Sequence, residues 1–421
     1  MPISEDFAKR LLPLLPGIVA EYGTPFHIYD AQGIVRTHRA MEQEFGDLPF
    51  RQYFAVKALP NPAVLFLLLR EGSGLDCSSH IELLLADRVG ARGEDIVFTS
   101  NNTSMTEYTQ AVEAGALVTF DDRTMLDKVD TLPDVVAFRV SPHGLPASSR
   151  LMGDAVHSKF GVPVDEIVDA YRDARRRGAT SFGIHGMSCA NELDTGRAIR
   201  AAVDLLELGG RVSAEAGADL VYVNVGGGLG VPCQPTDEPF DFRAYAAAIV
   251  AARALVFGAG GPRILMECGR FVTGPHGVLV TRVINRCSKG REVIGLDASM
   301  SALMRPAIYG AYHHISLPFA GGRRLATFDV VGSLCENMDK FAVDRLLPEP
   351  REGDVVLIHD TGAHGHSMGF TYNGRLRPAE FLLTTADEVV RIRRPETFDD
   401  YVGTVCWWPE PAPAGRAVAE V

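Results

Sequence analysis

Between residues 53 and 270 the chain repeats one pattern, a short apolar run followed by a longer stretch with helical spacing. Two of the helical stretches are Ser79–Val89 and Thr195–Leu208. Strands and helices that alternate in this way are typical of a parallel sheet. Eight such units within about 220 residues predict a (β/α)8 barrel, with a doubly wound open sheet as the alternative because periodicity alone does not show closure. The predicted strands are Tyr53–Lys57, Gly74–Ser79, Ile96–Ser100, Leu117–Asp121, Val135–Ser141, Ser181–Met187, Leu220–Gly226 and Ile264–Arg270.

The pattern changes after about residue 275, where short apolar runs are separated by glycine, proline and charged residues. This change predicts a second, mostly β domain of sandwich or barrel type. Its predicted strands are Val278–Arg282, Glu292–Leu296, Val355–Ile358 and Val389–Arg393, and a small early strand at Thr24–Tyr29 is a candidate to pair with them. We expect a barrel over residues 30–275, a β domain from residues 1–29 and 276–410, and a loose tail over residues 411–421.

Charge and composition exclude several kinds of partner. The net charge of −12 argues against nucleic acid and anionic membranes, because both bind basic surfaces. No window approaches about 18 uninterrupted apolar residues and the N-terminus lacks a signal-peptide pattern, so we expect no membrane span. The seven cysteines are scattered and never form a C-x-x-C pair, which indicates a cytoplasmic location and no zinc site. His364 and His366 lack the further ligands that a metal site needs.

The segment YFAVKALPNP (residues 53–62) places Lys57 at the end of a predicted strand. Lysine is rarely fully buried, so the simplest interpretation is that Lys57 marks the solvent-exposed end of the strand. In a (β/α)8 barrel, however, catalytic groups lie at the C-terminal ends of the strands. Other predicted strands also end in polar or glycine residues, among them Asp76, Asn101, His185, Gly226 and Glu267. Residues of these kinds gathered at one rim favour an active site.

The segment VNVGGGLG (residues 223–230) has three glycines directly after an apolar strand. Glycines let the backbone approach a ligand and offer N–H groups to an anion, although an ordinary tight turn has the same composition. Beside a lysine at another strand end, the loop suggests pyridoxal 5′-phosphate (PLP), which forms a Schiff base with lysine. In MECGRF (residues 266–271), Glu267 could keep the pyridine nitrogen of PLP protonated, or it could form only an ion pair with Arg270.

Together these segments resemble the diaminopimelate decarboxylases, PLP-dependent enzymes that join an alanine-racemase-like barrel to a C-terminal β domain. In the barrel the resemblance is carried by YFAVKALPNP, DCSSHIELLLA, NVGGGLG and ECGRF. It continues through LMRPAIYGAYHHI, GSLCENMDKFAVDRLLPEPREGD and HDTGAHGHSMGFTYNGRLRPAEFLL, which begin at residues 303, 332 and 359. These last three motifs are highly specific, because no simple packing rule produces them.

The resemblance implies roles for individual residues. Those that would contact the cofactor are Lys57 (covalently), Gly227, Gly228 and the backbone around Gly269 and Arg270 (phosphate), Glu267 (pyridine nitrogen), and Tyr372 (near the phosphate). Those that would contact the substrate are Arg270, Arg305 and Tyr309 (distal carboxylate), Cys335 (proton donor), Glu336 (distal amino group) and Tyr372. Cys335 and Glu336 would enter the partner subunit's site, so the resemblance implies a homodimer with shared active sites. The implied reaction, a step of lysine biosynthesis, converts meso-2,6-diaminopimelate to L-lysine and CO2.

The chain departs from the family pattern next to the predicted cofactor. The histidine that stacks on the ring in many members aligns with Met187, and the serine that usually meets the phosphate aligns with Ala190. A thioether can pack on an aromatic ring. His185 points to the same strand face as Met187 and is a candidate substitute for the stacking residue. Cys268 stands where the family often has proline.

Several alternative functions stay open. A decarboxylase of ornithine or arginine would share the fold and cofactor, but its cationic substrate tail would favour acids where Arg305 and Tyr309 stand. A racemase would need a second acid–base group on the opposite face of the cofactor, and Cys335 with Glu336 fits decarboxylation better. A non-catalytic PLP-binding protein would need none of these residues. A modified diacid of a specialised pathway is a further candidate substrate.

Overall fold

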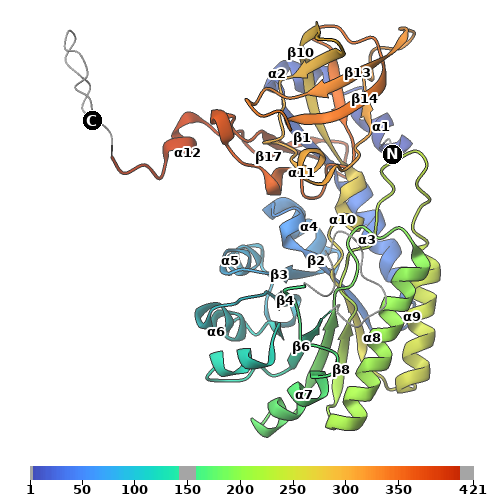
Figure 1. The fold of residues 1–421 in the computed structure, drawn as a ribbon, viewed down its shortest axis with the longest axis vertical. Helices are drawn as coiled ribbons and strands as arrows, with labels where there is room; N and C mark the ends of the chain where they lie inside the picture. The colour runs from blue at the N-terminus through green and yellow to red at the C-terminus, as the bar shows by residue number, and fades with distance from the viewer. Residues whose placement is uncertain (1–2, 142–157, 408–421) are drawn as a thin grey trace.

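The larger unit of the protein is a closed barrel of eight parallel strands that adjoin in chain order (Figure 1). The structure, a computed structural model, describes residues 3–141 and 158–407. The prediction of a barrel is confirmed, and each of the eight predicted strands contributes one barrel strand. The strands are β2 (Phe50–Ala55), β3 (Gly74–Cys77), β4 (Ile96–Thr99), β5 (Leu117–Phe120), β6 (Val136–Val140), β7 (Phe182–Gly186), β8 (Leu220–Asn224) and β9 (Arg263–Met266).

The barrel strands end earlier than the sequence predicts. β2 stops at Ala55, and Lys57 lies in a 3-10 turn, Val56–Ala58, beyond the strand. The pairing explains the difference, because the register between β2 and β3 ends at Ala55 and Asp76. Residues past the last paired position can leave the sheet and turn over the mouth of the barrel. The predicted functional residues of β2 and β9 therefore lie in the loops at the rim.

The interior of the barrel is filled by side chains, so a ligand can bind only at its mouth. The interior cluster consists of Tyr53, Val97, Leu117, Ala137, Tyr222 and Leu265. Helices cover the outside, and local sequence signals set their ends. Ser79 caps α5 by accepting a hydrogen bond from the Glu82 N–H. The covering helices are α3 (Ala31–Phe45), α4 (Pro62–Arg70), α5 (His80–Val89), α6 (Met105–Glu113), α7 (Ile167–Arg176), α8 (Thr195–Ala216) and α9 (Phe242–Phe257).

The second unit is a mostly β domain, as predicted. Its main sheet has the order β14-β13-β11-β10-β1-β16-β17, and β15 pairs with β10 and β12. The early strand β1 (Phe26–Asp30) pairs antiparallel with β10 and parallel with β16, which confirms its predicted partner domain. The other strands are β10 (Gly277–Ser288), β11 (Glu292–Leu296), β12 (Ile315–Ser316), β13 (Leu325–Val331), β14 (Lys340–Pro348), β15 (Val355–Ile358), β16 (Ala379–Leu383) and β17 (Val389–Arg393).

The sequence predictions omit β12, β13, β14 and β16. β14, with the sequence KFAVDRLLP, mixes charged and apolar residues because only part of its surface is buried. Such edge strands give a weak periodic signal. At the N-terminus, α1 (Glu5–Leu11) and α2 (Leu15–Tyr22) pack their apolar faces onto the β domain.

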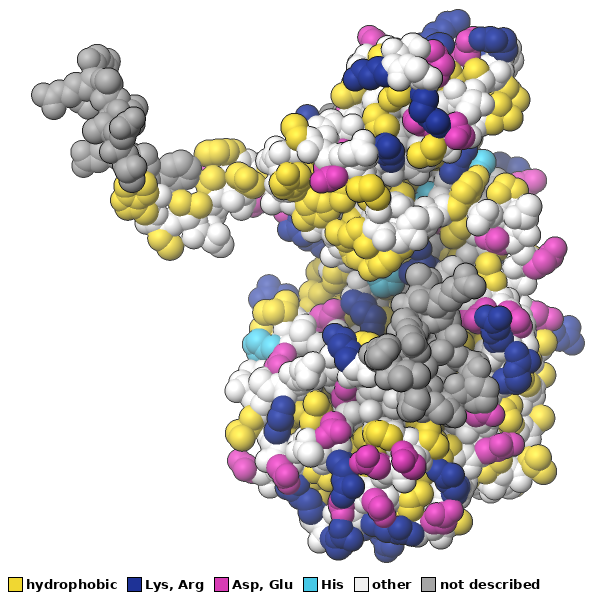
Figure 2. Space-filling model, in the orientation of Figure 1, with side chains coloured by type: hydrophobic (Ala, Val, Ile, Leu, Met, Phe, Trp, Pro, Cys, Tyr) yellow, Lys and Arg dark blue, Asp and Glu magenta, His cyan; other side chains and the backbone are white. Residues whose placement is uncertain are grey.

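Near its C-terminus the chain leaves the β domain as an extended segment that carries α12 (Phe398–Val402) (Figure 1). Hydrophobic side chains line this segment (Figure 2), and Phe398, Tyr401, Val405 and Trp407 are exposed. The predicted tail over residues 411–421 lies outside the described residues. Within the described ranges, no helix is both long enough and apolar enough to cross a membrane.

Candidate active site

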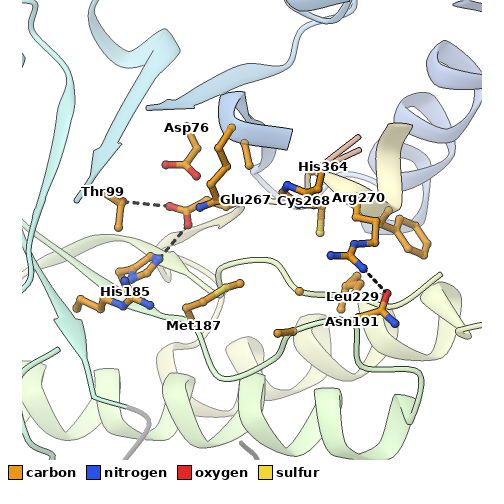
Figure 3. Close-up of a pocket in the computed structure, with 17 residues that line it drawn as sticks. Asp76, Thr99, His185, Met187, Asn191, Leu229, Glu267, Cys268, Arg270 and His364 are labelled. Atoms are coloured by element: carbon orange, nitrogen blue, oxygen red, sulfur yellow. Dashed lines mark hydrogen bonds and ion pairs between the residues drawn. The ribbon is translucent and has the colours of Figure 1, made fainter. Parts of the chain in front are cut away.

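A cavity of about 160 Å³ lies at the C-terminal mouth of the barrel (Figure 3). Its lining comes from the ends of most barrel strands together with His364 of the β domain. The structure brings six of the predicted cofactor residues into this lining, although they are scattered along the chain. They are Lys57, His185, Gly228, Glu267, Gly269 and Arg270.

The turn that carries Lys57 is anchored to the β domain. The carbonyl of Ala58 accepts a hydrogen bond from the backbone N–H of His364 at 2.8 Å and another from the Ser367 hydroxyl at 3.2 Å. Asn61 caps α4 and donates from its side chain to the buried carboxylate of Glu380 at 2.9 Å. These contacts hold the lysine segment in place relative to both domains.

Glu267 lies directly after β9 and is buried at the floor of the cavity. Its carboxylate accepts hydrogen bonds from Asn224 Nδ2 at 2.7 Å and Thr99 Oγ1 at 3.3 Å. It also pairs with His185 Nε2 at 3.0 Å (Figure 3). Burial opposes ionisation of this carboxyl group, but His185, Lys57 and Asn224 together outweigh burial and lower the pKa of Glu267. The result is an ionised buried carboxylate, which suits a partner for a protonated ring nitrogen.

Two further charged residues, Asp76 and Arg139, line the cavity, and the sequence analysis assigns neither a role. Both are buried, and within the described residues Asp76 Oδ1 and Arg139 Nε have no hydrogen-bond partner. Burial and the nearby Glu267 raise the pKa of Asp76, and burial lowers that of Arg139. A signal is present in the strand VVAFRV, because an arginine inside an apolar strand needs a partner. Arg139 Nη1 lies 3.7 Å from Asp121 Oδ1 in an ion pair, which leaves Nε without a partner among the described residues. Unpartnered buried polar atoms at a cavity indicate a polar ligand.

The glycine loop approaches the cavity closely. Gly228 has a φ of +82°, and a Cβ atom there would lie 2.0 Å from the carbonyl oxygen of Cys189. Only glycine fits this conformation and this close contact. Gly227, by contrast, does not line the cavity, and its N–H donates to Met187 Sδ at 3.2 Å. Of the two predicted phosphate glycines, only Gly228 therefore borders the cavity.

A second cavity, of about 470 Å³, adjoins the first. Arg305 and Tyr309 line it from α11 (Arg305–Tyr309) of the β domain. Arg270 lies at the start of α10 (Arg270–Thr273), borders both cavities and donates to Asn191 Oδ1 at 3.3 Å (Figure 3). The structure thus gathers the three residues predicted to hold a distal carboxylate. The residues common to both linings are Ala190, Asn191, Arg270 and His364.

The guanidinium groups of Arg270 and Arg305 both line this cavity, where Arg305 is buried and Arg270 is half-buried. Burial lowers the pKa of Arg270 to about 10, and the positive charge of Arg305 contributes to the shift. Burial also lowers the pKa of Arg305, whose Nε has no hydrogen-bond partner within the described residues. Buried like charges are unfavourable unless an anion lies between them, and a carboxylate can bind guanidinium groups through two oxygens. The second cavity is therefore suited to a carboxylate.

His364 lies where the two cavities meet, and the sequence analysis considers it only as a metal ligand. Burial lowers its pKa to about 3, and the charges of Arg270 and Arg305 lower it further. The imidazole is therefore neutral at physiological pH. Within residues 3–141 and 158–407, no three His, Cys, Asp or Glu residues are grouped so that they could hold a metal ion. A ligand that reaches from Lys57 to Arg305 would pass His364.

Three predicted site residues lie elsewhere on this chain. Cys335 and Glu336 are exposed, and Tyr372 is 54% exposed; none of them is among the described residues that line either cavity. They share one surface, because the Cys335 N–H donates to Asn373 Oδ1 at 2.8 Å and Asn373 follows Tyr372. Within one chain they do not meet Lys57.

The cavity fits PLP. Lys57 offers the amine and Glu267 an ionised partner for the ring nitrogen. Asp76 Oδ1 and His185 Nδ1 are buried polar atoms that find no partner in the part of the chain that the structure describes. Met187 lines the cavity, where a thioether can contact an aromatic ring. Ala190 also lines it and has no hydroxyl, so a phosphate there would depend on backbone N–H groups.

Comparisons with known proteins agree with this fit. Residues 31–274 match the family model of the pyridoxal-binding domain of pyridoxal-dependent decarboxylases. The chain is 64% identical to protein TabA of Pseudomonas amygdali pv. tabaci over 97% of both chains. It is 35% identical to a diaminopimelate decarboxylase of Methanothermobacter thermautotrophicus over 90% of this chain and 91% of that protein.

A solved structure also covers nearly the whole fold. Diaminopimelate decarboxylase from M. jannaschii, in co-complex with L-lysine, superposes with a TM-score of 0.85 at 26% identity, over 93% of this chain and 94% of that one. The barrel, the cavity with its lysine at the mouth, and the match over residues 31–274 lead to one conclusion. The chain belongs to the pyridoxal-dependent decarboxylases, lyases whose cofactor is PLP.

Proposed function

We propose that this enzyme decarboxylates meso-2,6-diaminopimelate to L-lysine and CO2. The observation that carries the proposal is the pair of guanidinium groups, half-buried Arg270 and buried Arg305, in a cavity that adjoins that of Lys57. A substrate with a carboxylate at each end can present one to the cofactor and the other to these arginines. A substrate with a cationic tail would instead face two positive charges.

The residues of the chain would then act as follows. Arg270, Arg305 and Tyr309 hold the distal carboxylate and so orient the α-carboxylate over the cofactor. PLP, when bound, withdraws the electron pair that the departing carboxylate leaves behind. Glu267, kept ionised by His185, Lys57 and Asn224, stabilises the protonated ring nitrogen. The neutral imidazole of His364 lies where the two cavities meet and adds no charge beside the substrate.

The comparisons support this substrate class and leave room for a second candidate. The two other relatives described above carry the name diaminopimelate decarboxylase, and one of them was solved with L-lysine. The relative with 64% identity has a different name, protein TabA. A related diacid with a modified chain is therefore the second candidate substrate, and the cavity of about 470 Å³ leaves room for it.

The test is CO2 release from a panel of amino acids by the PLP-loaded enzyme, with Arg305→Ala in parallel. We expect release from meso-diaminopimelate and none from L-lysine, L-ornithine or L-arginine. Removing one partner of a buried charge pair costs about 2–5 kcal/mol, so Arg305→Ala should lower kcat/KM for diaminopimelate at least about tenfold. Arg291→Ala is the matched control, because Arg291 pairs with Asp329 on the β-domain surface. Release from ornithine or arginine, or an unaffected Arg305→Ala variant, would contradict the proposed substrate.

We further propose that two copies of the chain share their active sites, with Cys335 of a second copy delivering the proton to the reacting carbon. Its exposed position, beside exposed Glu336 and Tyr372, supports a role outside its own cavity. Exposed apolar side chains nearby, such as Met338 and Val343, could be covered by that copy.

Mixing two inactive variants tests the shared site. Lys57→Ala and Cys335→Ala should each be inactive alone, and a mixture should recover part of the activity, because a mixed dimer has one site with both groups intact. CO2 release is measured before and after mixing, and native mass spectrometry checks that mixed dimers form. Mixed dimers without recovered activity would place Cys335 outside the partner's site.

A further inference from the structure

We propose that His313 is a positioning residue for Arg305. The neutral imidazole of His313 accepts a hydrogen bond from the guanidinium group and holds it in place. Because the imidazole carries no negative charge, the positive charge of Arg305 remains available to the distal carboxylate of the substrate. This inference rests on the proposed function, because it assigns Arg305 to a substrate carboxylate.

Hydrogen bonds define how His313 holds Arg305. Arg305 is 5% exposed, and its Nη1 lies 3.0 Å from His313 Nε2. The other ring nitrogen, His313 Nδ1, lies 2.7 Å from the carbonyl oxygen of His359. A carbonyl oxygen can only accept, so Nδ1 carries the hydrogen and donates it. Nε2 of the neutral ring is then free to accept the hydrogen bond from Arg305.

The surroundings keep His313 neutral. Its ring is fully buried, and burial together with the charge of Arg305 lowers its pKa to about 3. Two other histidines in the same region, His314 and His359, also have lowered pKa values, mainly because of burial. At neutral pH His313 therefore orients a cation and contributes no charge.

A neutral partner is unusual for a buried arginine, which ordinarily pairs with a carboxylate. No carboxylate of the described residues forms an ion pair with Arg305, although the charge of the buried Asp360 acts on it. Arg305 Nε has no hydrogen-bond partner within the described residues. An acidic residue at position 313 would satisfy the guanidinium group inside the protein and weaken its attraction for a substrate. A histidine fixes the geometry of Arg305 and leaves that attraction intact.

The test compares two variants of similar size and different charge, His313→Gln and His313→Glu, in the PLP-loaded enzyme. The amide of glutamine can accept from Arg305 and donate to the His359 carbonyl, as histidine does, whereas glutamate adds a negative charge beside Arg305. We expect KM for meso-diaminopimelate to stay near the wild-type value in His313→Gln. In His313→Glu it should rise at least roughly tenfold, the scale of a lost hydrogen bond to a charged group, while kcat changes much less.

A binding measurement separates positioning from a general structural role. Pimelate has the same chain length and both carboxylates but no amino group to react, so calorimetric titration with it reports the carboxylate clamp alone. Pimelate should bind His313→Gln about as well as the wild type and His313→Glu much more weakly. His314→Ala is the matched control, because His314 adjoins the same segment and contacts the His359 ring rather than Arg305. PLP content and the unfolding temperature of each variant show that it is folded.

The outcomes distinguish this inference from the proposed function. Equal KM and equal pimelate affinity in His313→Gln and His313→Glu would overturn the inference, and so would an effect on kcat alone. If Arg305→Ala raises KM and the two His313 variants do not, the clamp stands and only the role of His313 fails. If Arg305→Ala leaves KM unchanged, the proposed function fails first.

Discussion

Replacing Lys57 by alanine is expected to abolish CO2 release and the covalent retention of PLP. Lys57 supplies the only lysine amine among the described residues that line the cavity. We expect activity to fall by at least about 10²–10⁴-fold, the contribution of a single positioned acid–base group, with further loss from the missing covalent attachment. The measurements are CO2 release from the diacid and mass spectrometry after borohydride reduction, which leaves PLP attached to a lysine in the wild type.

Lys57→Arg is the matched variant, because arginine keeps a positive charge at the position and cannot form the same bond to the cofactor. It should be as inactive as Lys57→Ala, while the unfolding temperature of the protein without PLP stays close to the wild-type value. A Lys57→Arg enzyme that still releases CO2 at the wild-type rate would show that only the charge matters. If the reduced protein yields a peptide that carries PLP on another lysine, that lysine and not Lys57 is the attachment site.

Replacing Glu267 by glutamine is expected to lower kcat on the order of 10²-fold or more, the scale observed when one preorganised electrostatic contact is removed from an active site. Glutamine keeps the size of the side chain and can still accept from Asn224 at 2.7 Å, so the fold should survive. What it removes is the negative charge that we propose to stabilise the protonated ring nitrogen. We expect a large loss of kcat with little change in KM, measured by CO2 release at saturating PLP.

The control for this prediction is Glu82→Gln. Glu82 is also a carboxylate near the rim of the barrel, but it accepts hydrogen bonds from Ser78 and does not line the cavity. The Glu82→Gln variant should therefore have the wild-type kcat. If Glu267→Gln keeps the wild-type kcat while PLP is fully bound, the ring nitrogen does not depend on this carboxylate. The buried contact between His185 Nε2 and Glu267 at 3.0 Å would then serve another purpose than keeping Glu267 ionised for the ring nitrogen.

Much of the barrel could be predicted because each of its strands is a short apolar run that is bounded by polar or glycine residues. A strand such as β8, LVYVN, is apolar and is followed by glycines that can only be a loop. Edge strands of the β domain such as β14 were missed, because exposed strands mix charged and apolar residues. The lengths of the barrel strands were also overestimated, since a strand ends where its neighbours stop pairing, which no local pattern records.

The active site could be predicted in part, mainly through the resemblance of its motifs to those of a known family. Lys57, Glu267 and Arg305 stand in distinctive motifs, and the structure places each of them at one of the two adjoining cavities. Asp76 and Arg139 were not assigned, because a charged residue in an apolar strand looks the same whether it faces a ligand or an ion-pair partner. His364 had been considered only as a metal ligand, and its place between the two cavities depends on how the β domain packs on the barrel.

The sequence by itself determined the alternation of strands and helices, the change to a β domain, and the kinds of side chain that lie at the rim. These properties depend on local backbone preferences and burial, which neighbouring residues decide. The tertiary structure alone decided which rim residues share a cavity, that Gly228 rather than Gly227 borders it, and that Arg305 is held by His313 instead of a carboxylate. Such contacts join residues far apart in the chain, and only the closure of the barrel and the packing of the two domains bring them within hydrogen-bonding distance.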